Sequence, residues 1–559
     1  MKTSRNFETS MLSKRLPRVN RTAHGSGEAR VPMRDFWKNF EIRPHVTVVA
    51  FFIAFLVIGL TIFKDYGVHW DEYQNQSFGR RWINYVYAVS KARSLSVPLP
   101  EFSLHDLIHG LAFEVFLAAL TDSFRLKNSR DVILMRHLIV FLLFYVGVIF
   151  FYLLCRRHFQ NWRPALLGCV FLVLSPRIFA DAFYNSVDIA FLSLFIIGMF
   201  TLVVMLDTRT LLSAVAHAFV CAILINIRLA GLFLSIVTVM FFCLEASRAR
   251  LIQDRMADLR ALAGHLLFLG VLTVLFNPFL WANPLTNFIS LVGHLVNFKE
   301  WGKRVHYLGA FFRYGLMPWH YALVWIMVST PLLYLVLFFA GVFASIRLFF
   351  SNGAGSYLTK RNTAIFLVCF FLPLFIATGR LYNGWRHIYF IYPSLLILAA
   401  IGFQDVWQNI RPVVRGMLIV GLVFGSLDTA LFMVRNHPYQ SIYFNRLSGK
   451  NASEITNRFE LDYWGLSYRK ALEYILKTDG ETIIPVCFSS ECPGKNNMKI
   501  LLPEERKRLV YESAEKAKYF LMNDMVHPPK YAGKEYCAIR VDGMRIMVVY
   551  KLDHEARKE

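Results

Sequence analysis

The sequence has few charged residues for its length. Asp, Glu, Lys and Arg make up 18% of the 559 residues, whereas soluble globular proteins carry about a quarter. Hydrophobic residues make up 56% of the chain and gather in long runs. This composition excludes an ordinary soluble fold and predicts a protein that crosses a membrane several times.

Acidic residues are scarcer than basic ones: 38 Asp and Glu stand against 61 Lys and Arg, a formal net charge of +23. In a soluble chain such an excess suggests nucleic-acid binding. Here much of it falls in the N-terminal tail and in short segments between apolar runs, such as 156–163 and 246–260, as the positive-inside rule predicts. Membrane lipids and lipid-linked phosphates are therefore the expected partners, and nucleic acid is not.

The eight cysteines contain no Cys-x-x-Cys pair and no zinc-finger spacing. Cys487 and Cys492 lie in the more polar C-terminal part, where their spacing permits a disulfide without deciding it. A cleavable signal peptide is not expected either. The first 44 residues are polar and basic, and the apolar run that begins near Val46 is predicted to be a retained signal-anchor helix.

Eleven apolar runs have the length and composition of membrane-spanning helices. They cover roughly residues 46–63, 132–155, 162–176, 186–206, 211–227, 229–245, 261–280, 320–349, 363–378, 388–407 and 414–434. The basic tail predicts a cytoplasmic N-terminus, and an odd number of spans then puts the C-terminus outside. We therefore expect an α-helical polytopic protein of the plasma membrane, which in bacteria is the inner membrane.

The predicted parts are a cytoplasmic basic tail (1–44), a transmembrane domain (45–435) and an extracytoplasmic α/β domain (436–559). The transmembrane domain includes a large outer loop, residues 64–131. In the last part, segments 482–488 and 518–523 read as strands, and 537–552 reads as a hairpin that turns at Asp542 and Gly543.

The first candidate site is the acidic pair in the segment WDEYQNQSFG. Asp71 and Glu72 lie just beyond the first apolar run, flanked by Trp70 and Tyr73, and aromatic residues are typical of the membrane interface. A carboxylate there can act as a general base at the boundary between lipid and water. The alternative is a solvated loop in which two adjacent acids have no role.

The second candidate site is the segment SPRIFADAFYNSVD, in which Ser175 can cap a helix that begins at Pro176. Four polar residues follow at steps of four, four and three, which predicts one shared helical face: Arg177, Asp181, Asn185 and Asp188. Ionisable groups beside a membrane span often mark a functional site. A structural Arg–Asp network that joins two helices is the alternative, and the two interpretations are compatible.

Three further basic residues are candidates for binding a phosphate. Arg386 and His387 lie among aromatic residues in segment 379–393, and Arg136 lies about one turn into the second apolar run. Arg binds phosphate through two parallel hydrogen bonds and keeps its charge. Snorkelling of these side chains to the membrane surface is the alternative.

His105 and His109 are four residues apart, with an acid between them, in the large outer loop. That spacing can present two ligands to a metal ion. The other interpretation is an amphipathic helix that lies on the membrane surface.

The order of these features resembles the GT-C superfamily of integral-membrane glycosyltransferases, especially its protein O-mannosyltransferase and lipid A aminoarabinose transferase branch. The resemblance covers most of the chain. Its closest local match is WDEYQNQSFG, which is similar to the Asp-Glu and later Phe-Gly of protein O-mannosyltransferases. The His-Pro-Pro-Leu-Gly-Lys motif of those enzymes is not found, which favours a bacterial relative that acts on a lipid or surface glycan.

The resemblance implies a transferase that moves a sugar from a polyprenyl-phosphate donor to an extracytoplasmic lipid, glycan or protein, with inversion. It implies Asp71 as the base, and Glu72 as a group that positions the acceptor or holds a divalent metal ion. The donor phosphate would be bound by basic residues: Arg136, Arg177, Arg386 and His387. The polar cluster of Asp181, Asn185 and Asp188 would contact substrate or support the fold.

No cofactor is implied beyond a possible divalent metal ion, for which Glu72, His105 and His109 are the candidate ligands. Two alternatives to the enzyme stay open. One is a polytopic transporter or flippase for a lipid-linked or anionic substrate, although no internal repeat supports it. The other is a non-catalytic membrane scaffold.

Overall fold

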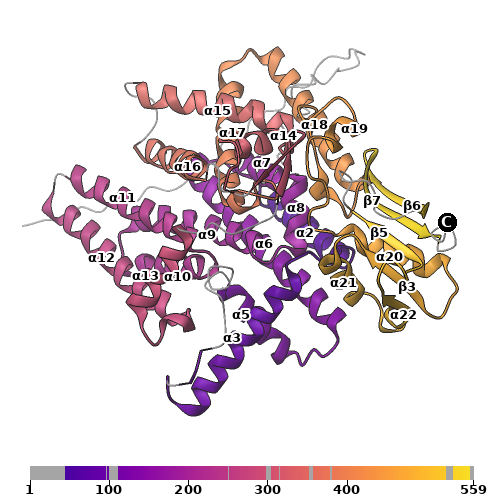
Figure 1. Cartoon of the computed structure of the whole chain (residues 1–559). Coiled ribbons are helices and arrows are strands. Elements are labelled where there is room, and N and C mark those ends of the chain that lie inside the picture. The colour runs from indigo at the N-terminus through magenta and orange to yellow at the C-terminus, as the bar shows by residue number, and fades with distance from the viewer. Residues whose placement is uncertain are drawn as a thin grey trace, which may run out of the picture. The chain divides into compact units, whose positions relative to one another are not determined.

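The computed structural model describes residues 44–559, except for 96, 100–110, 250, 297–303, 314, 352–356, 378–380, 524–532 and 554–559. The contacts divide the chain into two units, residues 1–50 and 51–559. The sections below concern the second unit, which is mainly helical and carries a sheet near the C-terminus (Figure 1).

The helices are, in chain order, α2 (Pro44–Ile62), α3 (Glu72–Ala92), α5 (Leu111–Ser123), α6 (Ser129–Phe159), α7 (Trp162–Val173), α8 (Pro176–Tyr184), α9 (Asp188–Thr208), α10 (Leu211–Ile227), α11 (Leu232–Arg248), α12 (Ile252–Leu275), α13 (Pro284–Val296), α14 (Tyr321–Ser329), α15 (Leu332–Phe350), α16 (Tyr357–Ile376), α17 (Tyr392–Asn409), α18 (Pro412–Arg435), α19 (Ala452–Thr456), α20 (Ser467–Thr478), α21 (Glu491–Lys499) and α22 (Pro503–Arg508). Short 3₁₀ helices include η1 (Leu229–Gly231) and η3 (Arg386–Ile391).

The prediction of a polytopic helical membrane protein is confirmed. Within the described residues, nine helices are long and apolar enough to cross a membrane, and ten if α7 and α8, bent by 66°, form one span. Helix α10 is apolar but has only 17 residues. Each of the eleven predicted runs overlaps one of these helices, but only nine or ten of the eleven expected spans have the length and composition of a span in the described residues.

The eighth predicted run, 320–349, is not a single helix. Helix α14 ends at Ser329, and α15 begins only after Pro331. Proline lacks a backbone N–H and disfavours helical geometry in the residue before it, which here is Thr330 in an extended conformation. The longer of the two pieces, α15, is the one with the length of a span.

Helices α15 and α17 cross at two glycines. A Cβ atom on Gly341 would lie 1.7 Å from the carbonyl oxygen of Leu398, and one on Gly402 would lie 2.0 Å from that of Leu337. Small residues let helix backbones approach closely where lipid provides no hydrophobic driving force for association. This crossing supports α17, whose N-terminal end continues from η3 and its candidate residue Arg386.

The C-terminal sheet has the strand order β4-β3-β5-β7-β6. Its strands are β3 (Ile484–Phe488), β4 (Leu509–Tyr511), β5 (Tyr519–Met522), β6 (Gly533–Val541) and β7 (Met544–Leu552). Strands β4, β3 and β5 are parallel, and β7 pairs antiparallel with both β5 and β6. The predicted hairpin is confirmed, because Asp542 and Gly543 join β6 to β7 with φ of 44° and 83°, as a two-residue turn requires. A separate hairpin pairs β1 (Arg304–Tyr307) with β2 (Ala310–Arg313).

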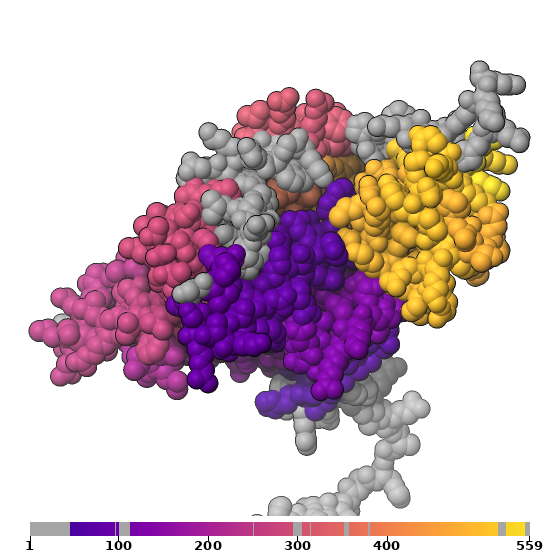
Figure 2. Space-filling model, turned by 60° about the horizontal axis from the view of Figure 1, so that its bottom comes forward, coloured from indigo at the N-terminus to yellow at the C-terminus, as the bar shows by residue number. Residues whose placement is uncertain are grey.

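The C-terminal residues pack closely on the early part of the chain. Figure 2 shows the yellow C-terminal residues against residues in indigo and violet. One apolar core contains residues of the membrane helices, such as Phe141, together with Val541 and Met544 of the hairpin. The proposed domain boundary between 435 and 436 stays a prediction.

A substitution at the α15–α17 crossing tests this packing. Gly341→Ala is expected to lower the free energy of unfolding by about 1–3 kcal/mol, because the added methyl forces the two backbones apart. The matched control is Gly416→Ala in α18, where a Cβ atom would meet nothing within 4 Å. Thermal unfolding of both variants in detergent is the measurement. Equal melting temperatures for Gly341→Ala and wild type would contradict the close crossing.

Candidate active site

A cavity of about 450 Å³ opens at one end of the helices, where α9 begins and α10 ends. We call this the cavity end, and the opposite end, where α9 ends and α10 begins, the far end. The walls come from segment 69–78, the turn after α10, the β1–β2 hairpin, and segments 382–387 and 456–464. Six residues with charged side chains line the cavity: Asp71, Arg228, Arg304, Arg386, Glu460 and Asp462.

Asp71 presents its carboxylate to this cavity. It is the N-cap residue of α3, but its side chain makes no capping hydrogen bond. The side chain is 39% exposed, and its Oδ2 lies 4.0 Å from Nη2 of Arg386. The backbone N–H of Asp71 donates to Nδ1 of His69 over 3.1 Å. The backbone of Asp71 is thus held in place, while its carboxylate oxygens remain accessible.

Hydrogen bonds from helix α21 hold the segment just before Asp71. The side chain of Asn497 accepts a hydrogen bond from the N–H of Val68 and donates to its carbonyl, both at 2.8 Å. The neighbouring Asn496 donates to the carbonyl oxygens of His69 and Trp70, at 3.2 and 3.0 Å. The C-terminal part of the chain therefore helps determine where Asp71 lies.

Glu72 faces the other way and is buried. Its carboxylate pairs with Nε2 of His69 at 2.8 Å and with Nε of Arg136. Burial by itself would raise the pKa of Glu72, but the charge of Arg136 and the hydrogen bond from His69 hold this pKa well below its usual range. Arg136 and His69 occupy the oxygens that an acceptor or a metal ion would need. Of the two adjacent acids, Asp71 thus faces the cavity and Glu72 lies in the protein interior.

Arg136 also differs from expectation. It lies two turns into α6, and its Nη2 pairs with Oε2 of Glu114 at 2.8 Å in addition to its contact with Glu72. It does not line the 450 Å³ cavity but a second one, of about 360 Å³, beside α3 and α5. The expected contact with a donor phosphate therefore finds no support in its position.

Asp188 joins two arginines at the floor of the cavity. This fully buried carboxylate, the first residue of α9, pairs with Nη2 of Arg228 through Oδ1 and with Nη1 of Arg386 through Oδ2, the latter at 3.3 Å. Sequence reasoning missed Arg228. The available signal was a single arginine inside the apolar stretch AILINIRLAGLF, since an ionisable residue in such a stretch is a candidate functional group.

The four polar residues from Arg177 to Asp188 do not share one helical face. Helix α8 ends at Tyr184, Asn185 caps it, and a break separates it from α9, so the prediction of one continuous helix is wrong. The break still brings three of the residues together: Nδ2 of Asn185 donates to Asp181 at 3.2 Å and to Asp188 at 2.9 Å. Of these residues Asn185 lines the cavity.

Arg177 is buried away from the cavity wall. Its guanidinium lies 5.2 Å from the ring centre of Trp325 and 5.1 Å from that of Phe444. Nη2 donates to the carbonyl of Tyr443 over 3.2 Å. These contacts fit a role in holding α8 to the segment after α18 better than the predicted contact with phosphate.

Aromatic rings surround the cavity face of Arg386. Its guanidinium carbon lies 4.7 Å from the ring centre of Trp464 and 5.4 Å from that of Tyr382. The imidazole of His387, a cavity-lining residue as expected for the site, lies 4.5 Å from the same Tyr382 ring. Trp464 was not predicted, although it belongs to the aromatic stretch FELDYWGLSY.

The structure bears on the possible Cys487–Cys492 disulfide but not on the possible metal site at His105 and His109. His105 and His109 lie outside the described residues. Cys487 and Cys492 are both free thiols, as are the other six cysteines.

Comparisons with known proteins give structural matches only. No family model matches the chain, and a comparison with curated proteins finds no match either. ArnT from Cupriavidus metallidurans in the apo state is 12% identical with a TM-score of 0.49, and the match covers 90% of this chain and 98% of ArnT. The same enzyme bound to undecaprenyl phosphate is 14% identical over the same shares, with a TM-score of 0.44.

The archaeal oligosaccharyltransferase AglB from Archaeoglobus fulgidus, in complex with an inhibitory peptide and a dolichol-phosphate, is 10% identical with a TM-score of 0.44. That match covers 85% of this chain and 69% of AglB. Because identities and TM-scores are this low, the function proposed below rests on the geometry of the cavity.

The position of Arg136 predicts a structural role. Arg136→Leu leaves the buried carboxylates of Glu72 and Glu114 without their shared cation, so we expect a loss of about 3–5 kcal/mol of stability. Asp71→Asn, at a half-exposed carboxylate, is expected to melt within about a degree of wild type. The measurement is thermal unfolding of the purified variants in one detergent. If Arg136→Leu melted like wild type, the buried ion pairs would have to be absent.

Proposed function

We propose that the protein is an integral-membrane glycosyltransferase. It moves a sugar from a polyprenyl-phosphate donor to a hydroxyl of an extracytoplasmic lipid, glycan or protein acceptor, and inverts the anomeric carbon. The observation that carries this proposal is the pairing, in one cavity at the end of membrane helices, of an accessible carboxylate with the buried Arg386 and the partly buried Arg228. The sequence resemblance to GT-C enzymes suggests the same class.

Arg228 and Arg386 are the groups we assign to the donor phosphate. They share the single carboxylate of Asp188, so the three side chains together carry one positive charge at the cavity floor. Arginine donates parallel hydrogen bonds to phosphate oxygens and keeps its charge when buried. In an apolar surrounding, donors already in place stabilise the charge that develops on a leaving phosphate without reorganisation of solvent.

Asp71 is assigned as the general base. Its carboxylate takes the proton of the acceptor hydroxyl, whose oxygen forms a bond to the anomeric carbon while the bond from that carbon to the phosphate oxygen breaks. The polyprenyl phosphate leaves with the bonding electron pair. Arg386 lies 4.0 Å from Asp71 and also faces the proposed phosphate site. Inversion then requires the acceptor oxygen and the leaving phosphate to lie on opposite sides of the reacting carbon.

The orientation that suits this reaction puts the cavity end outside and the far end in the cytoplasm. The far end carries many of the arginines that flank the membrane helices: Arg156, Arg157, Arg209, Arg248, Arg347, Arg361, Arg411 and Arg415. Basic residues in short connections favour the cytoplasmic side. The donor lipid then reaches the cavity from the bilayer, and the acceptor reaches it from outside.

Asp71→Asn tests the base. With purified protein in nanodiscs and a panel of polyprenyl-phosphate sugars, we expect transfer or slow hydrolysis to fall by about 10²–10⁴-fold while donor affinity changes little. The matched control is Asp65→Asn, a carboxylate that is half exposed, pairs with His437 and does not line the cavity. Full activity in Asp71→Asn would remove the base from the proposal. Failure of wild type to bind any lipid-linked sugar would favour a non-catalytic scaffold or a transporter of another anionic substrate.

Arg228→Gln tests the phosphate site at the residue that sequence reasoning missed. Turnover is expected to fall by about 10²–10³-fold, with weaker binding of polyprenyl phosphate, because one donor to the leaving group is lost. Arg228→Lys should recover part of the binding, and Arg435→Gln, at an exposed position at the end of α18, should match wild type. A variant Arg228→Gln that is folded and fully active would contradict the assignment.

A further inference from the structure

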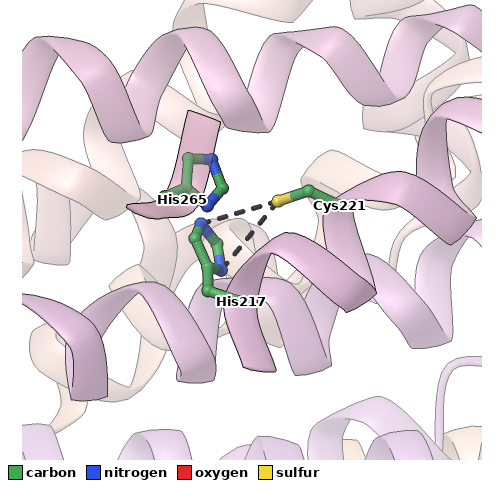
Figure 3. A group of neighbouring side chains, drawn as sticks. All are labelled: His217, Cys221 and His265. Atoms are coloured by element: carbon green, nitrogen blue, oxygen red, sulfur yellow. Dashed lines mark hydrogen bonds between the residues drawn. The ribbon is translucent and has the colours of Figure 1, made fainter. Parts of the chain in front are cut away.

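Three side chains with metal-binding atoms meet inside the helical part, away from the cavity. His217 and Cys221 lie four residues apart on α10, so they share one face, and His265 approaches from α12 (Figure 3). All three are completely buried. One ligand atom from each can be chosen so that all lie within 4.8 Å of one another. No other group of this kind occurs in the described part of the chain.

The separation of sulfur and nitrogen already suits a shared metal ion. Sγ of Cys221 lies 3.5 Å from Nε2 of His217 and 3.9 Å from its Nδ1. Typical bonds of roughly 2.0–2.1 Å to nitrogen and 2.3 Å to sulfur put two ligands of one tetrahedral ion about 3.6 Å apart. Nε2 is therefore the nitrogen of His217 that points to the site.

The hydrogen bonds of His217 can be completed if Nε2 holds a metal ion. Nδ1 lies 2.8 Å from Oγ1 of Thr201, and that hydroxyl donates to the carbonyl of Gly198. Nε2 lies 2.8 Å from Oγ1 of Thr238, which likewise donates to the carbonyl of Leu234. A neutral imidazole carries one N–H, so it can donate to only one of the two hydroxyls. A metal ion on Nε2 replaces the contact with Thr238, whose hydroxyl keeps its bond to the carbonyl of Leu234. The Nδ1–H then donates to Thr201, the usual second contact of a metal-bound histidine.

His265 supplies the third nitrogen. Its ring touches the backbone of Ala214, but neither ring nitrogen makes a hydrogen bond of good geometry with the described residues. Its ring stacks on His217 with centres 4.8 Å apart and an interplanar angle of 23°. A metal ion lies in the plane of each imidazole that binds it, so His265 must turn out of this stack to reach the ion. Metal binding would give a buried ring nitrogen of His265 a ligand bond, where it otherwise has only a poor hydrogen-bond partner.

The charge of the site selects the ion. A thiolate and two neutral imidazoles carry one negative charge, and the cluster contains no carboxylate. A monovalent ion gives a neutral complex, whereas a divalent ion leaves a positive charge in an apolar interior, which is costly. Thiolate and imidazole ligands also suit copper in its cuprous state. We propose that His217, Cys221 and His265 bind one cuprous ion, which joins α10 to α12.

Binding exchanges a proton for the metal ion. The thiol of Cys221 loses its proton to solvent as the Cu–S bond forms, and the oxidation state of copper does not change. An ion that binds only the folded chain stabilises it by mass action. Copper stoichiometry and the melting temperature are therefore two independent readouts, and neither depends on transferase activity.

The experiment uses the full chain in nanodiscs, stripped with a chelator and incubated anaerobically with cuprous ion against a competing chromophoric chelator. We expect one copper per chain, X-ray absorption with one sulfur and two nitrogen ligands, and a higher melting temperature. Cys221→Ser, which preserves side-chain size, should lower copper affinity at least tenfold. The matched control is Cys243→Ser, at an exposed cysteine of neighbouring α11.

His265→Phe is the second variant, since it keeps an aromatic ring in the stack while it removes the nitrogen ligands. It should also lose copper and the copper-dependent rise in melting temperature. Equal copper binding by wild type, Cys221→Ser and His265→Phe would overturn the proposal. So would a folded wild type that binds no copper, or that binds one zinc ion in preference to copper.

Discussion

The arrangement of the cavity depends on a carboxylate, Asp188, that is buried between Arg228 and Arg386. The three residues come from the start of α9, the end of α10 and the start of η3. Removing three charges from water is costly, so such a cluster persists where its members neutralise one another and the fold holds them together. In return it determines the relative position of three chain segments and leaves one net positive charge at the cavity floor.

A second set of ion pairs explains why two adjacent acids behave differently. The carboxylate of Glu72 pairs with Arg136 and His69, and its contact with Arg136 joins the start of α3 to α6. Asp71, one residue earlier, is left facing the cavity and lies 4.0 Å from Arg386. Helix α21 completes the arrangement, because Asn497 holds the backbone at Val68. The C-terminal part thus contributes directly to the geometry of a cavity between membrane helices.

Properties that depend on local pattern could be read from the sequence. Hydropathy located the nine helices of the described residues that have the length and composition of a span, although it predicted eleven spans. The Asp-Gly turn located the β6–β7 hairpin. Asp71, Arg386 and His387 were expected in one site and do line one cavity. Contacts between distant segments could not be read in this way. A helical repeat could not reveal the break after Tyr184, and the position of Arg136 could not reveal Glu114 as its partner. Arg228 was missed because its carboxylate partner lies 40 residues earlier in the chain.

The central claim is that Arg228 and Arg386 bind the phosphate of a lipid donor beside Asp71. Its most direct test is a cryo-electron microscopy structure of the protein in nanodiscs that contain polyprenyl phosphate. The account predicts phosphate density in hydrogen-bonding contact with both guanidinium groups and the prenyl chain leaving the cavity toward the bilayer. Density for the phosphate at Arg136 in the second cavity, with the 450 Å³ cavity containing only water, would contradict it.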